Sequence, residues 1–222
     1  MHFDKTLSFF EELSENNTRE WFNEHKADYQ ASKEEFETFV SKLTAMMSAH
    51  DHVDEKRTKI YRIYKDVRFS KDKTPYKTSW SANVKRVRGL RGGYYLQVSR
   101  GNSYLAGGFF NPNPADLLHI RKHLSQDSEP FRASLKAKEV MEYFGELRGE
   151  QVKSAPKGFS KDDENIDLLR YKQFVLRHTF RDKEVLSDDF VAVVSHGFKL
   201  MRPYFDVMTE LLSTDLNGLP MD

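Results

Sequence analysis

The chain has 222 residues, enough for one domain with a sizeable core, and its 38% hydrophobic and 13% aromatic content argues against an intrinsically disordered protein. It contains no cysteine, which excludes disulfides, thiolate metal ligands and a thiol nucleophile and favours a cytoplasmic location. The first residues lack the apolar stretch of a signal peptide. The longest apolar run, residues 190–194, is far shorter than the ~20 residues that span a bilayer, so we expect neither export nor a membrane partner.

Charge is distributed unevenly along the chain, although the net charge is only +1. Residues 56–91, the basic strip, carry 13 basic and 2 acidic side chains, whereas residues 1–55 carry 5 and 13. A concentrated positive field favours anionic partners such as phosphates, carboxylates or nucleic acid. The alternative is that the basic strip pairs with the acidic N-terminal helices of the same molecule.

Residues 1–50 are predicted to be helical. Apolar residues recur at helical spacing up to Leu13, and Asn17 followed by Glu20 is a capping-box pattern that opens a second helix. The apolar stripe then continues to Met47, with a break near residue 31.

Residues 58–111 are predicted to be β-rich, because the hydrophobic period changes to two. The expected strands cover residues 60–69, 79–84, 93–99 and 103–110, and a tight turn at Gly101 joins the last two. Since no alternating βαβ pattern accompanies them, we expect an antiparallel meander and not a doubly wound parallel sheet.

Residues 112–222 are predicted to mix helices with short strands. Asn113 caps a helix that Pro114 opens, and a second helix begins near Ser128. A strand is expected over residues 174–180, and Ser187 is expected to cap a long final helix kinked at Pro203. The predicted fold class is α+β: an antiparallel meander sheet packed by N-terminal and C-terminal helices, in a single domain over residues 1–222.

The usual catalytic and cofactor motifs are missing. Neither a Gly-x-Gly-x-x-Gly nor a Walker-type phosphate loop occurs. His119 and His123 are spaced for one face of a predicted helix, and His50 and His52 lie in a predicted loop, but both pairs are more typical of surface histidines than of a metal site. We therefore expect no cofactor and no metal, and the sequence assigns no reaction.

One dense group of polar residues lies within Arg62–Tyr76. If residues 62–68 form one extended strand, one of its faces carries Arg62, Tyr64, Asp66 and Arg68. Residues two apart on that face are then separated by roughly 6.6 Å. Ile63, Val67 and Phe69 then point to the buried face. A carboxylate held between two guanidinium groups would stay ionised and orient both for bidentate binding of phosphate or carboxylate. A turn at Pro75 would bring Lys73 and Tyr76 back toward the strand. The candidate ligand-binding residues are Arg62, Asp66, Arg68, Lys73 and Tyr76.

Two other interpretations of this group stay open. The same residues could form a purely architectural salt-bridge network with Asp66 as a buried hub, in which case its loss would be strongly destabilising. Asp66 and Asp72 could hold a divalent cation, although the neighbouring cations oppose this.

At these residues the chain resembles a bacterial family of conserved hypothetical proteins that is also found inside some larger fungal proteins. The family signature is Arg-x-x-Arg-Asp-x-Arg-Phe followed by Lys-x-x-Tyr. It corresponds here to Arg62, Lys65, Asp66, Arg68, Phe69, Lys73 and Tyr76. Lys65 replaces the second arginine. Residues 16–22, 107–108 and 156–159 extend the resemblance over nearly the whole chain. The family is a domain of unknown function, so the resemblance implies a location for the site but no activity.

Three functions follow from the sequence. The first is binding of an anionic small molecule at the candidate residues, with Gly107-Gly108 permitting close backbone approach. The second is nucleic-acid binding through the basic strip, where Tyr61, Tyr64, Tyr76 and Trp80 interleave with cations. The third is a structural or interaction module. Neither an oligomeric state nor an enzymatic activity can be derived.

Overall fold

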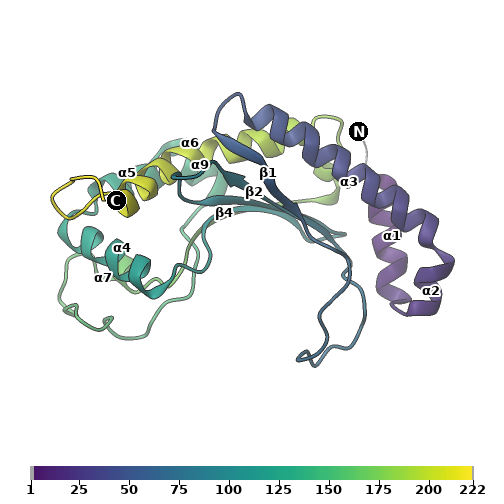
Figure 1. The fold of residues 1–222 in the computed structure, drawn as a ribbon, viewed down its shortest axis with the longest axis horizontal. Coiled ribbons are helices and arrows are strands. Elements are labelled where there is room, and N and C mark those ends of the chain that lie inside the picture. Colours follow the sequence, from purple (N-terminus) through teal and green to yellow (C-terminus); the bar gives the residue numbers. More distant parts are fainter. Residues whose placement is uncertain (1–2, 222) are drawn as a thin grey trace. The chain divides into compact units, whose positions relative to one another are not determined.

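The computed structural model of the chain describes residues 3–221, and its secondary structure is α+β as expected (Figure 1). An antiparallel sheet has the strand order β1-β2-β3-β4-β5, the meander that the sequence predicts. The strands are β1 (Val53–Ile60), β2 (Trp80–Arg86), β3 (Gly93–Val98), β4 (Ser103–Phe109) and β5 (Phe174–Phe180). The helices are α1 (Asp4–Glu15), α2 (Arg19–Glu24), α3 (Lys26–Met47), α4 (Pro114–Gln126), α5 (Glu129–Lys136), α6 (Lys138–Phe144), α7 (Ile166–Leu169), α8 (Asp182–Val185) and α9 (Phe190–Ser213).

The first strand differs from the prediction. It covers Val53–Ile60, whereas the sequence indicated residues 60–69. The remaining four predicted strands are confirmed within one or two residues at their ends. The misplaced strand arises because β1 is an edge strand rich in charged residues, so its hydrophobic alternation is weak.

Two of the predicted helix caps are wrong and one is confirmed. Thr18, not Asn17, caps α2: its hydroxyl accepts a hydrogen bond from the backbone N–H of Trp21. Ser187 lies three residues before Phe190, where α9 begins, and its hydroxyl donates to the Glu184 carbonyl or to the Asp189 carboxylate. Asn113 accepts from the N–H of Asp116 and caps α4 as predicted.

The contacts within the chain fall into two compact units, each assembled from three segments. Unit 1 comprises the chain up to Lys85 with residues 95–105 and 179–196, and unit 2 comprises residues 86–94, 106–178 and 197 onward. The basic strip is therefore divided between the units after Lys85. The single domain expected from the sequence stays a prediction.

Trp80 organises the core of unit 1. Its ring is buried and lies 6.1 Å from the rings of both Phe10 and Phe36, and its indole N–H donates to the hydroxyl of Ser32 in α3 (2.7 Å). Trp80, Ala82 and Val84 alternate with more polar residues along β2, as predicted. This face of β2 is therefore the one that α1 and α3 cover.

Tyr204 in α9 organises the core of unit 2, as Trp80 does in unit 1. Its hydroxyl donates to the carbonyl of Phe174 (2.9 Å), and burial raises the pKa of the phenol well above its usual value. Tyr94 packs on Phe198 and Phe205 of the same helix, with ring centroids 4.8 and 4.9 Å away. A ring cluster with one satisfied hydroxyl thus joins α9 to β5 within this unit.

Two glycines of β4 allow close packing in unit 2. A Cβ atom at Gly107 would collide with the side chains of Met201 and Phe205, and one at Gly108, whose φ is +141°, would collide with the backbone of Phe174. Close backbone approach was predicted for this pair, but here the approaching groups are β5 and α9 of the same chain. Between residues 3 and 221 no helix is both long and apolar enough to cross a membrane.

We predict that Gly108→Ala destabilises the protein by about 2–3 kcal/mol, since the added methyl group meets backbone that cannot rotate away. Urea unfolding measures this. Gly158→Ala is the matched control, because Gly158 also has a positive φ (+91°) but no atom of residues 3–221 beyond its chain neighbours lies within 4 Å of its Cβ position. This control should lose only about 1–2 kcal/mol of stability, which is the cost of holding a residue with a Cβ atom at a positive φ. Equal losses in the two variants would contradict the packing argument.

Candidate functional site

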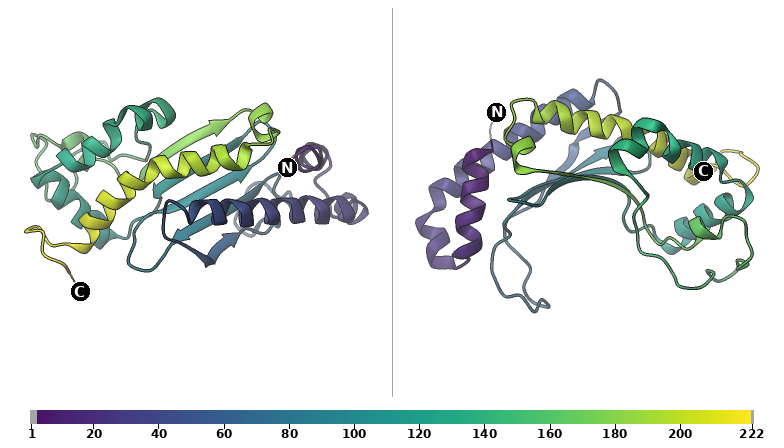
Figure 2. Two further views of the ribbon diagram at one scale, coloured as in Figure 1. Left: turned by 90° about the horizontal axis from the view of Figure 1, so that it is seen from above. Right: turned by 180° about the vertical axis from the view of Figure 1, so that it is seen from behind.

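The candidate segment is a loop between β1 and β2, and it extends away from the strands of unit 1 (Figure 2, right). One isolated antiparallel bridge, between Tyr64 and Tyr76, closes its base. The N–H of Lys65 donates to the Pro75 carbonyl and that of Lys77 to the Ile63 carbonyl, both at 2.8 Å. The extended strand predicted over residues 62–68 is therefore wrong.

Local side-chain hydrogen bonds explain why the segment turns. Asp72 accepts from the backbone N–H of Thr74 (2.9 Å), and Asp66 accepts from that of Arg68 (3.3 Å). Such Asp turns satisfy backbone donors that a strand ladder would need. The predicted buried face fails as well, because Ile63 is 0% exposed but Phe69 is 95% exposed at the loop.

Asp66 is paired with one guanidinium group and not two. Nε and Nη2 of Arg68 donate to its two carboxylate oxygens at 2.9 and 2.6 Å. These hydrogen bonds hold the pKa of Asp66 below its usual value, and Arg62 contributes only a weaker attraction at longer range. The predicted carboxylate between two arginines is absent, so no fixed pair of forks forms.

Two lysines of the loop bind its own groups. Lys65, the departure from the family signature, pairs with Asp72 (2.8 Å) and lowers the pKa of that carboxyl strongly. Lys73 donates to the carbonyl of Val67 (2.9 Å). Both side chains therefore stabilise the shape of the loop.

Tyr76 anchors the base of the loop to the N-terminal helices. Its ring is buried and stacks on Phe22 of α2, with centroids 3.9 Å apart and an interplanar angle of 14°. The side chain of Asn17 donates to the Tyr76 carbonyl (2.9 Å) and accepts from its N–H (3.1 Å). Asn17, predicted as a helix cap, thus pairs with the loop as a neighbouring strand would.

Three cations gather where the loop leaves β1. The ammonium groups of Lys59 and Lys77 lie 5.2 and 5.7 Å from the centroid of the Tyr61 ring, and Lys77 donates to the Arg62 carbonyl (3.1 Å). Arg62 is exposed. We call Lys59, Arg62 and Lys77 the loop-root cluster. The prediction included Arg62 but missed Lys59, whose place beside Tyr61 depends on the true position of β1.

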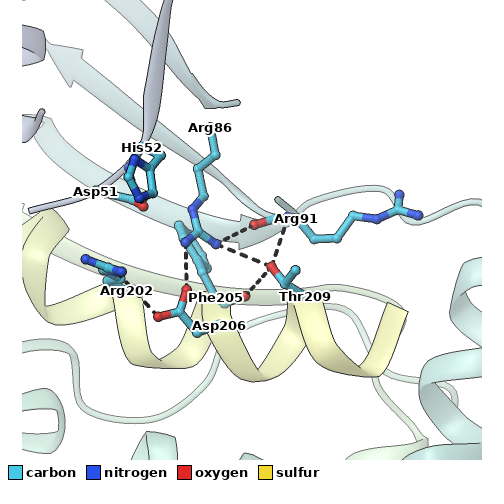
Figure 3. A network of polar contacts seen from close by, with 8 residues as sticks. All are labelled: Asp51, His52, Arg86, Arg91, Arg202, Phe205, Asp206 and Thr209. Carbon is cyan, nitrogen blue, oxygen red and sulfur yellow. Dashed lines mark hydrogen bonds and ion pairs between the residues drawn. The ribbon is translucent and has the colours of Figure 1, made fainter. Parts of the chain in front are cut away.

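Arg86, in the part of the basic strip that belongs to unit 2, is a buried charge that the sequence did not distinguish. Its guanidinium donates to Asp206 of α9 (2.7 Å) and to the Arg91 carbonyl (3.1 Å), while Thr209 accepts from the N–H of Arg91 (Figure 3). The guanidinium also lies 5.8 Å from the Phe205 ring. Arg86 therefore ties the turn after β2 to α9 and is unavailable to an outside ligand.

Of the histidines predicted to lie at the surface, His50, His119 and His123 are partly buried and contact residues distant in the chain. Nε2 of His119 and Nε2 of His123 lie 2.8 and 3.2 Å from the carbonyl of Thr214, beyond the end of α9. His50 contacts the hydroxyl of Ser195 (3.1 Å). In the described part of the chain no group of three or more His, Cys, Asp or Glu residues is arranged to hold a metal ion.

Comparison with known proteins confirms the resemblance to a family of conserved hypothetical proteins. The model of a family described as conserved hypothetical protein (DUF2461) matches residues 5–206. The chain belongs to this family. No curated protein and no solved structure gives a significant match to this DUF2461 protein. The matched range contains the whole loop and all five predicted ligand-binding residues, whose contact with a ligand stays a prediction.

We predict that Asn17→Ala destabilises the protein by about 1–3 kcal/mol, because it leaves two backbone groups of Tyr76 without their partners. Urea unfolding tests this, and trypsin should cleave the loop faster in the variant. Asn16→Ala is the control, since that exposed side chain makes one hydrogen bond to its own helix. A variant at Asn17 as stable as the one at Asn16 would show that the anchor contributes nothing.

We predict that Asp66→Asn leaves the melting temperature close to that of the wild type. The architectural interpretation required a buried hub, but the Asp66–Arg68 pair is solvent-exposed, and exposed ion pairs contribute little to stability. Differential scanning fluorimetry at low and moderate salt measures the effect. A large fall in melting temperature would restore the architectural interpretation.

Proposed function

We propose that this DUF2461 protein binds an anionic, phosphate- or carboxylate-bearing ligand at the root of the β1–β2 loop. Lys59, Arg62 and Lys77 are the residues proposed to contact it. The supporting observation is that the ammonium groups of Lys59 and Lys77 lie beside the Tyr61 ring and that the charge of Arg62 acts on Lys77. None of these three cations makes an ion pair within residues 3–221.

The pKa of Lys77 supports a positive potential at this position. Burial is the largest cause of its lowered pKa, and the neighbouring charges of Arg62 and Lys59 lower it further. The three cations repel one another, so an anion that enters between them lowers the electrostatic energy of the cluster. The partial burial of Lys77 removes water from this part of the cluster, which strengthens this attraction.

The other predicted site residues support the cluster indirectly in this proposal. The Asp66–Arg68 pair, the Lys73–Val67 contact and the stacked Tyr76 ring hold the loop that carries Arg62. Lys65 and Arg68 are neutralised by Asp72 and Asp66, whereas Arg62 and Lys77 at the root of the loop make no ion pair within residues 3–221. The loop-root cluster therefore replaces the predicted pair of arginine forks as the proposed binding site.

We predict that pyrophosphate or citrate binds the wild type and that the triple variant Lys59→Ala/Arg62→Ala/Lys77→Ala binds about tenfold or more weakly, since charge-assisted hydrogen bonds are lost. Isothermal titration calorimetry measures the dissociation constant. The charge-matched control is Lys122→Ala/Lys153→Ala/Lys161→Ala, which removes three exposed lysines of unit 2. Absence of binding to the wild type, or equal weakening in both triple variants, would refute the proposal.

We predict that binding weakens with rising pH earlier than an ordinary lysine pKa of about 10.4 would dictate. The sign follows from the lowered pKa of Lys77: the anion binds the protonated ammonium, and this proton is lost at a lower pH than usual. Lys77→Arg keeps the charge and should remove the early decline. Identical pH profiles for wild type and variant would contradict a role for Lys77.

A further inference from the structure

Three tyrosines form a row across the sheet surface of unit 1. The ring of Tyr61, just after β1, lies 6.4 Å from that of Tyr95 in β3, which lies 5.7 Å from that of Tyr104 in β4. All three rings are partly exposed. The row begins at the tyrosine that the loop-root cluster surrounds, so the rings and the cations adjoin.

The row is on the sheet face that α1 and α3 leave uncovered. Side chains alternate between faces along a strand, so Tyr95 is opposite to the buried Tyr94 and Leu96. The backbone N–H of Tyr61 donates to the carbonyl of Ser81, which places Tyr61 opposite the face of Trp80. The tyrosines therefore share a surface that the helical core of unit 1 does not need.

Polar groups lie on the same surface. By alternation Asn83 of β2 belongs to it, and its Oδ1 atom is buried without a hydrogen-bond partner in residues 3–221. Gln97 lies between Tyr95 and the Asn102 carbonyl, bonded to both. A buried amide oxygen with no partner is costly to the fold, so the side chain of Asn83 is not placed there for stability alone.

The positive charge of this surface extends beyond the loop-root cluster. Alternation puts Lys59 of β1 and the exposed Lys85 of β2 on the tyrosine face. Flat rings, amide groups and flanking cations together match the three parts of a nucleotide: the base face, the base edge and the phosphate.

We infer that the tyrosine face of unit 1 binds single-stranded nucleic acid, with bases stacked on Tyr61, Tyr95 and Tyr104 and phosphates at the loop-root cluster. This inference rests on the proposed anion site and names its ligand class. A duplex keeps its base faces stacked inside the helix, so only unpaired bases can use such rings. Of the rings in the basic strip, Tyr76 and Trp80 are buried and take no part.

The test is fluorescence anisotropy with labelled 12-mers of oligo(dT) and oligo(rU), together with inorganic polyphosphate as a competitor that carries charge but no rings. The variant Tyr95→Leu/Tyr104→Leu removes two rings, and the matched control Tyr95→Phe/Tyr104→Phe keeps them. Circular dichroism verifies the fold of each. We expect the Leu variant to bind oligonucleotide about tenfold or more weakly, with unchanged polyphosphate affinity, and the Phe control to stay within about threefold of the wild type.

The other outcomes contradict either the stacking inference alone or the stacking inference together with the anion site. If polyphosphate binds and the Leu variant keeps its oligonucleotide affinity, or if a 12-bp duplex binds as tightly as the single strands, the stacking inference is wrong while the anion site stands. If pyrophosphate binds and oligonucleotides do not, the ligand is a small anion. If neither polyphosphate, pyrophosphate nor oligonucleotide binds at low salt, the anion site and the inference fall together.

Discussion

The double hydrogen bond between Asn17 and the backbone of Tyr76 is the constraint on which the candidate site depends. Together with the stack of Tyr76 on Phe22, it fixes the point where the β1–β2 loop returns to the sheet. The neighbouring Lys77 then reaches back to the Arg62 carbonyl, and this sets the place of Arg62 beside Lys59 and Tyr61. A side-chain amide thereby positions a cationic cluster that lies far from it in the sequence.

The distribution of ion pairs gives the loop its electrostatic character. Its two aspartates lie next to the cations they neutralise, Asp66 with Arg68 and Asp72 with Lys65, and both also cap backbone N–H groups. Because both carboxylates are engaged in this way, they stabilise turns and do not neutralise the positive charge at the root of the loop. Arg86 illustrates the opposite use of a cation, since its burial against Asp206 and Phe205 makes it part of the core of unit 2.

The uncovered face of the sheet in unit 1 adds a second chemical feature to the charge. A row of tyrosines lies there beside an amide oxygen, that of Asn83, for which residues 3–221 supply no hydrogen-bond partner. Cross-strand aromatic pairs do stabilise sheets, so the row has a structural value of its own. Its position next to Lys59 connects this surface with the loop between β1 and β2.

The sequence by itself determined the α+β class, the strands from β2 onward, the Asn113 cap and the family. Hydrophobic periodicity and turn residues are local properties, so the elements that they mark can be predicted without the tertiary structure. Only the tertiary structure decided the position of β1, the loop at residues 62–76 and the roles of Asn17 and Arg86. These depend on partners distant in the chain: the amide of Asn17 could equally cap a helix, and an alternating pattern of charged residues does not reveal which backbone groups their side chains will bind. The tyrosine row, too, needed the pairing of the strands from β1 to β4, since spacing within one strand cannot show which rings meet across a sheet.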